Sequence, residues 1–204
     1  MAKHYYAVKD GRNIGIYRTW SECESQVKGY SGAIYKKFSN YEEALEFING
    51  QDKIHLEKDI EKLSEKEMVA YVDGSFDKDS NYYSYGAVIF TDKGKETYSQ
   101  KENDINIVDM RNVAGEIKGA MYAMREALAK GKDILYLHYD YMGIEKWALA
   151  EWKTNKIGTK AYKEYYDSIK KDLKVVFIKV DAHSGVQYNE EADQLAKRAL
   201  GIDS

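Results

Sequence analysis

The sequence predicts an α/β protein in two parts: a small three-stranded module, then a mixed five-stranded sheet flanked by helices. Short apolar segments of strand length alternate along the chain with longer amphipathic segments. A stretch rich in Glu, Lys and Asp, with no aromatic residue, separates the two parts. We therefore divide the chain into a module at residues 1–50, a charged linker at 51–67 and a larger domain at 68–204.

The composition favours a soluble cytoplasmic protein. Of the 204 residues, 44% are hydrophobic and 32% are charged, which suits a core with a solvated surface. No apolar run reaches the roughly 18 residues that a membrane helix needs, and the start, MAKHYYAVKDGR, lacks the apolar core of a secretory signal. A single cysteine, Cys23, excludes an internal disulfide and fits a reducing compartment. We expect a monomer that binds no membrane.

Positive charge is concentrated in two regions, although the net charge is −3. Residues 1–40 hold seven Lys and Arg against three Asp and Glu, a balance of +4. Residues 146–174 hold eight against four, again +4. A polyanion would therefore meet two basic regions on a mildly acidic protein.

The first fifty residues predict a very small α/β module. Strands are expected at Tyr5–Val8, Gly15–Tyr17 and Ala33–Phe38. Ser21 and Glu24 have the spacing of a capping box that would open a helix ending at Val27, and Ser39 and Glu42 have the same spacing before a second helix.

Aromatic and basic residues are interleaved in this module. Tyr6, Trp20 and Tyr35 accompany a basic run that includes Lys36 and Lys37. Aromatic rings can stack on bases or sugars while lysines neutralise phosphates. A core position explains any single tyrosine better, because so small a module needs aromatic residues inside. The set as a whole favours contact with nucleic acid.

The run from YYAVKDGR to YEEALEFI resembles the hybrid-binding domain at the N-terminus of many cellular ribonucleases H. The resemblance rests on the spacing of YAV, GIY, W-x-E-C, Q-V-x-G and Y-K-K-F. In that family a Tyr and a Trp contact the DNA strand of an RNA–DNA hybrid, and an aromatic-Lys-Lys run contacts the rest of the duplex. The resemblance implies these roles for Tyr6, Trp20, Tyr35, Lys36 and Lys37, with double-stranded RNA as a second ligand of the module.

The larger domain has the element order β-β-β-α-β-α-β-α, which suggests a mixed sheet with helices on its faces. Strands are expected at Met68–Val72, Tyr85–Thr91, Lys95–Lys101, Asp133–Tyr139 and Val175–Val180. Helices are expected at Ala114–Lys130, 141–152, 159–173 and Asn189–Leu200.

Four acidic residues are expected to be buried in this domain. Asp73 and Asp140 each follow a buried strand, at the edge where open α/β sheets place their ligands. Glu116 lies on a helical row whose other members are all alanine, and Asp193 shares its row with Ala196 and a leucine. Both helical acids should therefore point toward the sheet.

Buried carboxylates need neutralising partners, since an unpaired buried charge is very costly. No Lys or Arg lies at a helical spacing that would pair with all four acids. Each acid alone is better explained as a surface residue, but together they indicate a site for two Mg²⁺ ions, with Mn²⁺ as a substitute. Two such ions, about 4 Å apart, can activate a water and stabilise the leaving oxygen in phosphodiester hydrolysis.

The segments YVDGS, NVAGEIKGA, YLHYD and YNEEADQLAK resemble, in order, the motifs of the ribonuclease H fold. The resemblance implies that Asp73, Glu116, Asp140 and Asp193 are catalytic metal ligands. Asp73 is expected to bridge the two ions, because its strand lies in the middle of the site. The resemblance also implies that His183, in a glycine-flanked loop, assists protonation or product release.

Further candidates surround these acids. Asn112 matches the start of a phosphate-binding pocket of the family, although the following Val113 departs from the commoner Asn. Asn189, one turn before the last acid, is expected to orient the site. Gly74 and Ser75 are expected to form a turn that lets a sugar–phosphate backbone approach closely.

The segment 141–160 occupies the place of a basic handle that some family members use to grip duplex. It contains four lysines, Trp147 and Trp152, but it is less basic than a full handle. Its tryptophans are better explained as core residues, and whether the segment grips nucleic acid stays open.

These inferences predict an endonuclease that cuts the RNA strand of RNA–DNA hybrids and leaves 3′-hydroxyl and 5′-phosphate ends. One alternative is another nuclease of the same fold, such as a junction resolvase or an integrase-like enzyme, and the N-terminal module argues against it. A second is a protein that binds hybrids or double-stranded RNA through an inert nuclease fold, and four intact acids argue against that.

Overall fold

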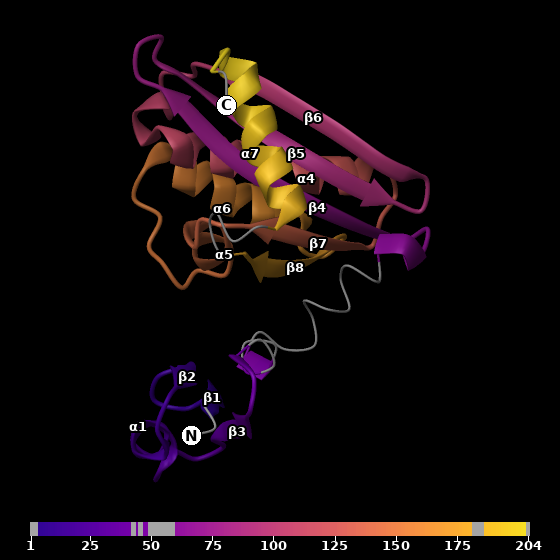
Figure 1. Cartoon of the computed structure of the whole chain (residues 1–204). Helices are drawn as coiled ribbons and strands as arrows, with labels where there is room; N and C mark the ends of the chain where they lie inside the picture. Colours follow the sequence, from indigo (N-terminus) through magenta and orange to yellow (C-terminus); the bar gives the residue numbers. More distant parts are fainter. Residues whose placement is uncertain (1–3, 42–43, 45–46, 49–59, 181–185, 203–204) are drawn as a thin grey trace. The chain divides into compact units, whose positions relative to one another are not determined.

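The chain forms two compact units, Met1–Glu61 and Lys62–Ser204 (Figure 1). The computed structural model describes residues 4–41, 44, 47–48, 60–180 and 186–202. Residues 51–59 of the expected linker lie outside the described residues, and its end contains a short 3₁₀ helix, η1 (Ile60–Lys62). No helix among the described residues combines the length and the apolar character that a bilayer crossing requires.

The first unit is a three-stranded antiparallel sheet with a helix packed against it. Its elements are β1 (Tyr5–Asp10), β2 (Gly15–Tyr17), α1 (Trp20–Val27) and β3 (Ile34–Phe38). The strand order is β2-β1-β3, and Val8 of β1 packs with Cys23 and Val27 of α1 in a small core. Tyr41, Ala44, Phe47 and Ile48 are helical, whereas Glu42 of the second expected capping pair lies outside the described residues.

The capping box expected at Ser21 and Glu24 is wrong, because α1 begins earlier. Thr19 is the N-cap: its hydroxyl accepts from the Glu22 backbone N–H at 3.3 Å, and the Glu22 carboxylate accepts from the Thr19 backbone N–H at 3.0 Å. The structure thus uses a neighbouring threonine–glutamate pair with the same spacing. Glu24 instead forms an ion pair with Lys28 at 3.0 Å.

The second unit is a mixed five-stranded sheet with helices on both faces, as predicted. Its strands are β4 (Glu67–Asp77), β5 (Tyr82–Thr91), β6 (Gly94–Glu102), β7 (Ile134–Tyr139) and β8 (Lys174–Lys179), in the order β6-β5-β4-β7-β8. Its helical elements are η2 (Val108–Met110), α4 (Asn112–Ala129), α5 (Gly143–Ala148), α6 (Ile157–Ile169) and α7 (Gln187–Leu200). The β4–β5 and β5–β6 pairs are antiparallel, and β4–β7 and β7–β8 are parallel.

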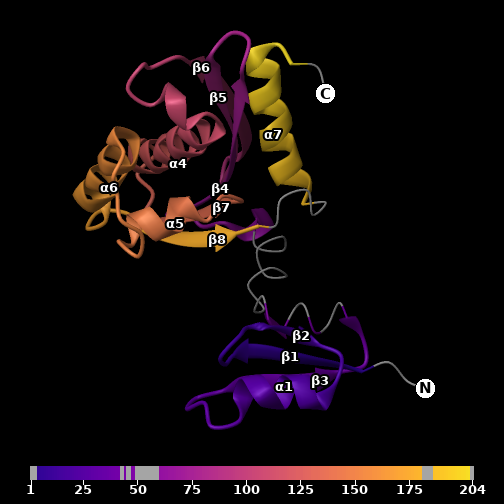
Figure 2. The same ribbon diagram turned by 90° about the vertical axis from the view of Figure 1, so that its left-hand side faces the viewer.

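Helices α4 and α7 lie on opposite faces of this sheet (Figure 2). The main core is formed by apolar residues of β4, β5 and β7 with the alanine row of α4. On α7, small residues allow a close approach: a Cβ on Gly86 of β5 would come within 2.1 Å of the Ala192 carbonyl oxygen. The Ser84 hydroxyl donates to the carbonyl oxygen of Ala196 at 2.7 Å. These contacts fix the position of α7 on β5.

β4 and α5 show the largest differences in length from the expected elements. β4 is longer, since its pairing with β5 continues through Gly74 and Ser75 to Asp77. α5 is shorter, because Ala150 adopts a φ of 60°, which a right-handed helix does not allow.

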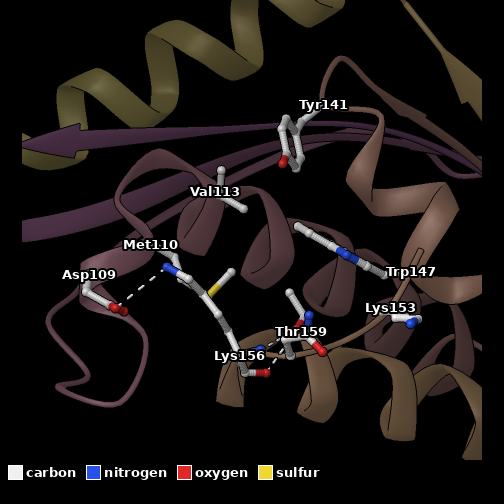
Figure 3. Close-up of a pocket in the computed structure, with 9 residues that line it drawn as sticks. Asp109, Met110, Val113, Tyr141, Trp147, Lys153, Lys156 and Thr159 are labelled. Carbon is white, nitrogen blue, oxygen red and sulfur yellow. Dashed lines mark hydrogen bonds and ion pairs between the residues drawn. The ribbon is translucent and has the colours of Figure 1, made fainter.

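A cavity of about 380 Å³ opens beside α5 (Figure 3). Its lining comes from η2, α4, α5, α6 and the segments that precede and follow α5: Asp109, Met110, Val113, Tyr141, Trp147, Lys153, Asn155, Lys156 and Thr159. Trp147 is 8% exposed, as expected of a core residue, whereas Trp152 is 43% exposed, against expectation.

Candidate active site

Parallel pairing of β4 and β7 brings Asp73 and Asp140 to one edge of the sheet. In that pair Tyr71 lies opposite His138, so each acid is two residues further along its own strand direction. Because the two strands are parallel, both carboxyl groups lie at the same edge of the sheet. Asp73 accepts a 2.7 Å hydrogen bond at Oδ1 from the Gly74 backbone N–H, which orients its side chain.

Glu116 reaches this edge from α4, which lies directly on β4. A Cβ on Gly74 would come within 2.4 Å of the Glu116 backbone nitrogen, and a Cβ on Gly115 within 2.0 Å of the Ser84 carbonyl oxygen. Only glycines permit this backbone-to-backbone contact. Glu116 is 2% exposed, so its carboxylate lies inside the protein rather than in water.

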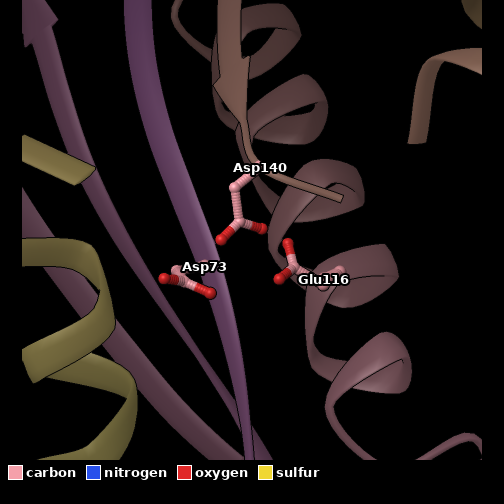
Figure 4. A group of neighbouring side chains, drawn as sticks. All are labelled: Asp73, Glu116 and Asp140. Carbon is pink, nitrogen blue, oxygen red and sulfur yellow. The ribbon is translucent and has the colours of Figure 1, made fainter. Parts of the chain in front are cut away.

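The three carboxylates form a compact cluster (Figure 4). One oxygen each of Asp73, Glu116 and Asp140 lies within 4.8 Å of the others. The Oε2 atom of Glu116 is buried and has no hydrogen-bond partner among the described residues. A buried carboxylate oxygen without a donor is suited to bind a cation or a proton.

Burial and mutual repulsion make Asp73 and Glu116 hard to ionise. Burial, and then the negative charge of Asp140, raise the pKa of Asp73 to about 7. Burial raises the pKa of Glu116 well above its ordinary value, and the charges of Asp73 and Asp140 raise it further. A divalent cation would offset the repulsion between these negative charges, and Mg²⁺ prefers hard oxygen ligands such as carboxylates. The cluster therefore fits the metal ions that the sequence predicts.

Asp193 lies at the rim of the cluster and not inside it. It projects from α7, is partly exposed, and accepts a 2.7 Å hydrogen bond at Oδ2 from Lys197 Nζ. Its negative charge still contributes to the raised pKa of Asp73. Asn189, one turn earlier, is buried, and its Oδ1 has no hydrogen-bond partner among the described residues.

A cavity of about 650 Å³ opens over the acids. Its lining includes all four acids and the candidates Gly74, Ser75 and Asn112: Asp73, Gly74, Ser75, Phe76, Lys78, Arg111, Asn112, Glu116, Asp140, Tyr141, Asp193 and Lys197. Sequence reasoning missed Lys78, Arg111 and Lys197. The spacing of Lys197, four residues after Asp193, was the available signal for the last of these.

Gly74 and Ser75 do not form the expected turn. Both are strand residues of β4, paired with Tyr85 and Ser84 of β5. Gly74 lacks a side chain because α4 approaches it, as the contact with the Glu116 nitrogen requires. His183 lies outside the described residues, and its role stays a prediction.

Three aromatic residues of the first unit lie together on one surface. The rings of Tyr6 and Tyr35 each lie 5.8 Å from that of Trp20, and Lys37 Nζ lies 5.8 Å from the Tyr6 ring centroid. Trp20 is 44% exposed, which a core residue would not be. Lys36 lies on the other face of β3, because successive strand residues alternate. Four of the five candidates are thus brought together.

Comparison with known proteins identifies both parts of the chain. Residues 4–48 match the model of the ribonuclease H1 N-terminal domain, and residues 65–201 match the RNase H model. The chain belongs to the ribonuclease H family. The predicted ribonuclease H enzyme with an N-terminal hybrid-binding domain is thereby confirmed.

Curated ribonucleases H resemble the chain over different lengths. Mouse ribonuclease H1 is 26% identical over 251 residues, which cover 95% of this chain and 88% of the relative. The ribonuclease H of Wolbachia pipientis wMel is 32% identical over 145 residues, covering 68% of this chain and 98% of the relative. The ribonuclease H of Saccharomyces cerevisiae is 60% identical over 45 residues, which cover 22% of this chain and 13% of the relative.

Solved structures of ribonucleases H share the fold of the larger unit. The RNase H1 of Halobacterium salinarum NRC-1 has a TM-score of 0.55 at 21% identity, covering 67% of this chain and 99% of that one. LC11-RNase H1 in complex with an RNA/DNA hybrid has a TM-score of 0.51 at 16% identity, covering 65% and 99%. Both confirm a ribonuclease H-like fold.

Proposed function

We propose that the protein is an endonuclease that hydrolyses the RNA strand of RNA–DNA hybrids and leaves 3′-hydroxyl and 5′-phosphate ends. The observation that carries this proposal is the cluster of Asp73, Glu116 and Asp140, in which the first two carboxylates are buried and the third is partly buried. It lies in a fold that LC11-RNase H1 presents with a bound RNA/DNA hybrid. A binding protein without catalysis would have no use for carboxylates this costly to bury.

Asp73, Glu116 and Asp140 would hold two Mg²⁺ ions, with Asp193 joining them from the rim. When bound, such ions polarise the scissile phosphate, lower the pKa of an attacking water and stabilise the leaving oxygen. The backbone N–H of Gly74 fixes the orientation of Asp73. Placement of the ligands is rigid because α4 and β4 meet at backbone contact.

Residues around the acids would position the RNA strand. Lys78, Arg111 and Asn112 line the same cavity and offer charged or amide donors to phosphates and 2′-hydroxyls. Ser75 adds a hydroxyl at the cavity wall. His183 would assist protonation or product release.

Two further surfaces would hold the duplex. Tyr6, Trp20, Tyr35 and Lys37 form the stacking and phosphate-binding surface of the N-terminal unit, and Lys36 would reach the duplex from the neighbouring face of β3. The cavity beside α5 shares Tyr141 with the active-site cavity, so its two lysines, Lys153 and Lys156, would meet the uncut strand (Figure 3).

The proposal is tested with three duplexes of one sequence, RNA–DNA, RNA–RNA and DNA–DNA, each labelled separately on both strands and incubated with Mg²⁺. We expect cleavage of the RNA strand of the hybrid only, no cleavage in excess EDTA, and recovery when Mg²⁺ is restored. Product ends are identified with two enzymes. Phosphatase should remove the 5′-phosphate, and ligase should join the 3′-hydroxyl end to a 5′-phosphate. Cleavage of DNA–DNA, or cleavage that persists in EDTA, would refute the proposal.

A further inference from the structure

One of the four acids, Asp193, differs from the other three because it forms an ion pair with a lysine. Lys197 Nζ lies 2.7 Å from Asp193 Oδ2, and the two side chains are 34% and 24% exposed. Both residues line the active-site cavity. The other three acids, by contrast, are grouped within 4.8 Å and include the unpartnered Oε2 of Glu116.

The charges in this cavity are therefore divided unequally. Three carboxylates share one edge of the sheet and face no lysine or arginine in the described ion pairs, whereas the fourth already has an ammonium group beside it. A carboxylate whose charge is balanced by an ammonium attracts a second cation less strongly. To join the cluster as a metal ligand, Asp193 has to exchange one positive partner for another.

We infer that Lys197 is a positioning residue that holds Asp193 at the rim and competes with divalent cations for it. The inference rests on the proposed metal site and specifies how its fourth ligand is regulated. Metal binding then includes the release of Lys197, so the measured affinity for the ion is lower than the carboxylates alone would give. Asp193 becomes a conditional ligand, in contrast to the three fixed ones.

The geometry of α7 makes this competition available. Asp193 and Lys197 are four residues apart, the spacing at which helical side chains meet. α7 itself is held on β5 by the close contact at Gly86 and the hydrogen bond from Ser84. The ion pair between Asp193 and Lys197 therefore cannot be broken by a movement of the helix. Exchange of partners has to occur by rotation of the two side chains.

The competing explanation is an ordinary surface ion pair. Lys163 and Asp167 on α6 show the same four-residue spacing away from the acids. Such a pair contributes little to stability and has no reason to affect ion binding. Lys163 therefore supplies a matched control for Lys197.

The experiment is calorimetric titration of the full chain with Mg²⁺, without nucleic acid. We expect Lys197→Met to bind Mg²⁺ about two- to fivefold more tightly than the wild type, the range that a partly exposed ion pair corresponds to. Lys197→Arg retains the ion pair and should bind as the wild type does. Lys163→Met should leave Mg²⁺ binding unchanged, and circular dichroism checks that each variant is folded.

A double-mutant cycle separates competition from a general effect of charge. In an Asp193→Asn background, Lys197→Met should no longer tighten Mg²⁺ binding, because the carboxylate that links the two is gone. An equal gain in both backgrounds, or no gain in the wild-type background, would overturn the inference while leaving the metal site intact. If the wild type binds no Mg²⁺, or if Asp73→Asn binds it equally well, the proposed metal site itself fails and the inference with it.

Discussion

Asp73 and Glu116 place carboxyl groups in surroundings that ordinarily hold apolar side chains. Asp73 ends a run of buried strand residues, and Glu116 stands where the rest of its helical row is alanine. Such surroundings favour the neutral, protonated form unless a cation is present. The same burial that raises both pKa values therefore couples stability, pH and metal binding.

The raised pKa of Asp73 predicts how the metal-free protein responds to pH. The pKa is about 7 in the folded state against an ordinary value of 3.8, so the folded state retains a proton that the unfolded state loses between these values. The contribution of Asp73 to the free energy of unfolding is therefore greatest below about pH 4 and falls as the pH rises to about 7. Asp73→Asn should remove most of this fall and stabilise the metal-free protein at pH 8 by about 2–4 kcal/mol.

Urea unfolding in EDTA between pH 4 and pH 8 measures this effect. Added Mg²⁺ at pH 8 should stabilise the wild type and have much less effect on Asp73→Asn. If the variant is less stable than the wild type at pH 8 without metal, Asp73 does not carry the buried charge described here.

At the scale of elements, the strands and helices that hold the acids could be predicted from the sequence. Apolar runs and the alanine row of α4 indicated buried elements, and those patterns are local. The roles of Gly74 and Gly115 could not be predicted. Each glycine is required because backbone atoms from a distant part of the chain pack where a side chain would otherwise lie. A glycine after an acid indicates a turn as readily as a close contact.

Element boundaries and side-chain partners were predicted less well for the same reason. β4 extends to Asp77 because β5 supplies hydrogen-bond partners, which the sequence of β4 alone does not reveal. Thr19 rather than Ser21 is the N-cap because the backbone of Thr19 is extended, whereas Ser21 already lies inside α1. Lys197 stands at the spacing of an ion pair, but only the fold shows that this pair borders a cluster of acids.

The elements of the N-terminal unit support a separate prediction about duplex binding. α1 and β3 bring Trp20 and Tyr35 together with Tyr6 of β1 on one exposed surface. Trp20→Ala should weaken binding of an RNA–DNA hybrid by about 1–3 kcal/mol, the contribution of one stacked base. Stability should change little, since the indole is already 44% exposed.

Fluorescence anisotropy with a labelled hybrid, in EDTA to prevent cleavage, measures the affinity of each variant. Tyr41→Ala is the matched control: Tyr41 is 46% exposed and packs edge-on to Tyr5, away from the three rings. Equal losses for the two variants would show that the three-ring surface has no special role.

The whole molecule combines two units with separate cores. The first carries an exposed aromatic surface with a lysine over one ring, and the second carries the buried acids. A charged segment between them would let both units bind one duplex, which raises the effective concentration of the active site without any new contact. Binding and cutting should therefore be separable by mutation.

Strand-resolved cleavage by the full chain with Asp73 intact or replaced tests the central claim most directly. An RNA–DNA hybrid labelled on either strand is incubated with Mg²⁺, and its binding is measured in parallel. The wild type should shorten the RNA strand alone, and Asp73→Asn should slow cleavage by roughly a thousandfold or more while binding the hybrid nearly as well. Cleavage by Asp73→Asn at the wild-type rate would contradict the assignment of the three clustered carboxylates as the catalytic metal site.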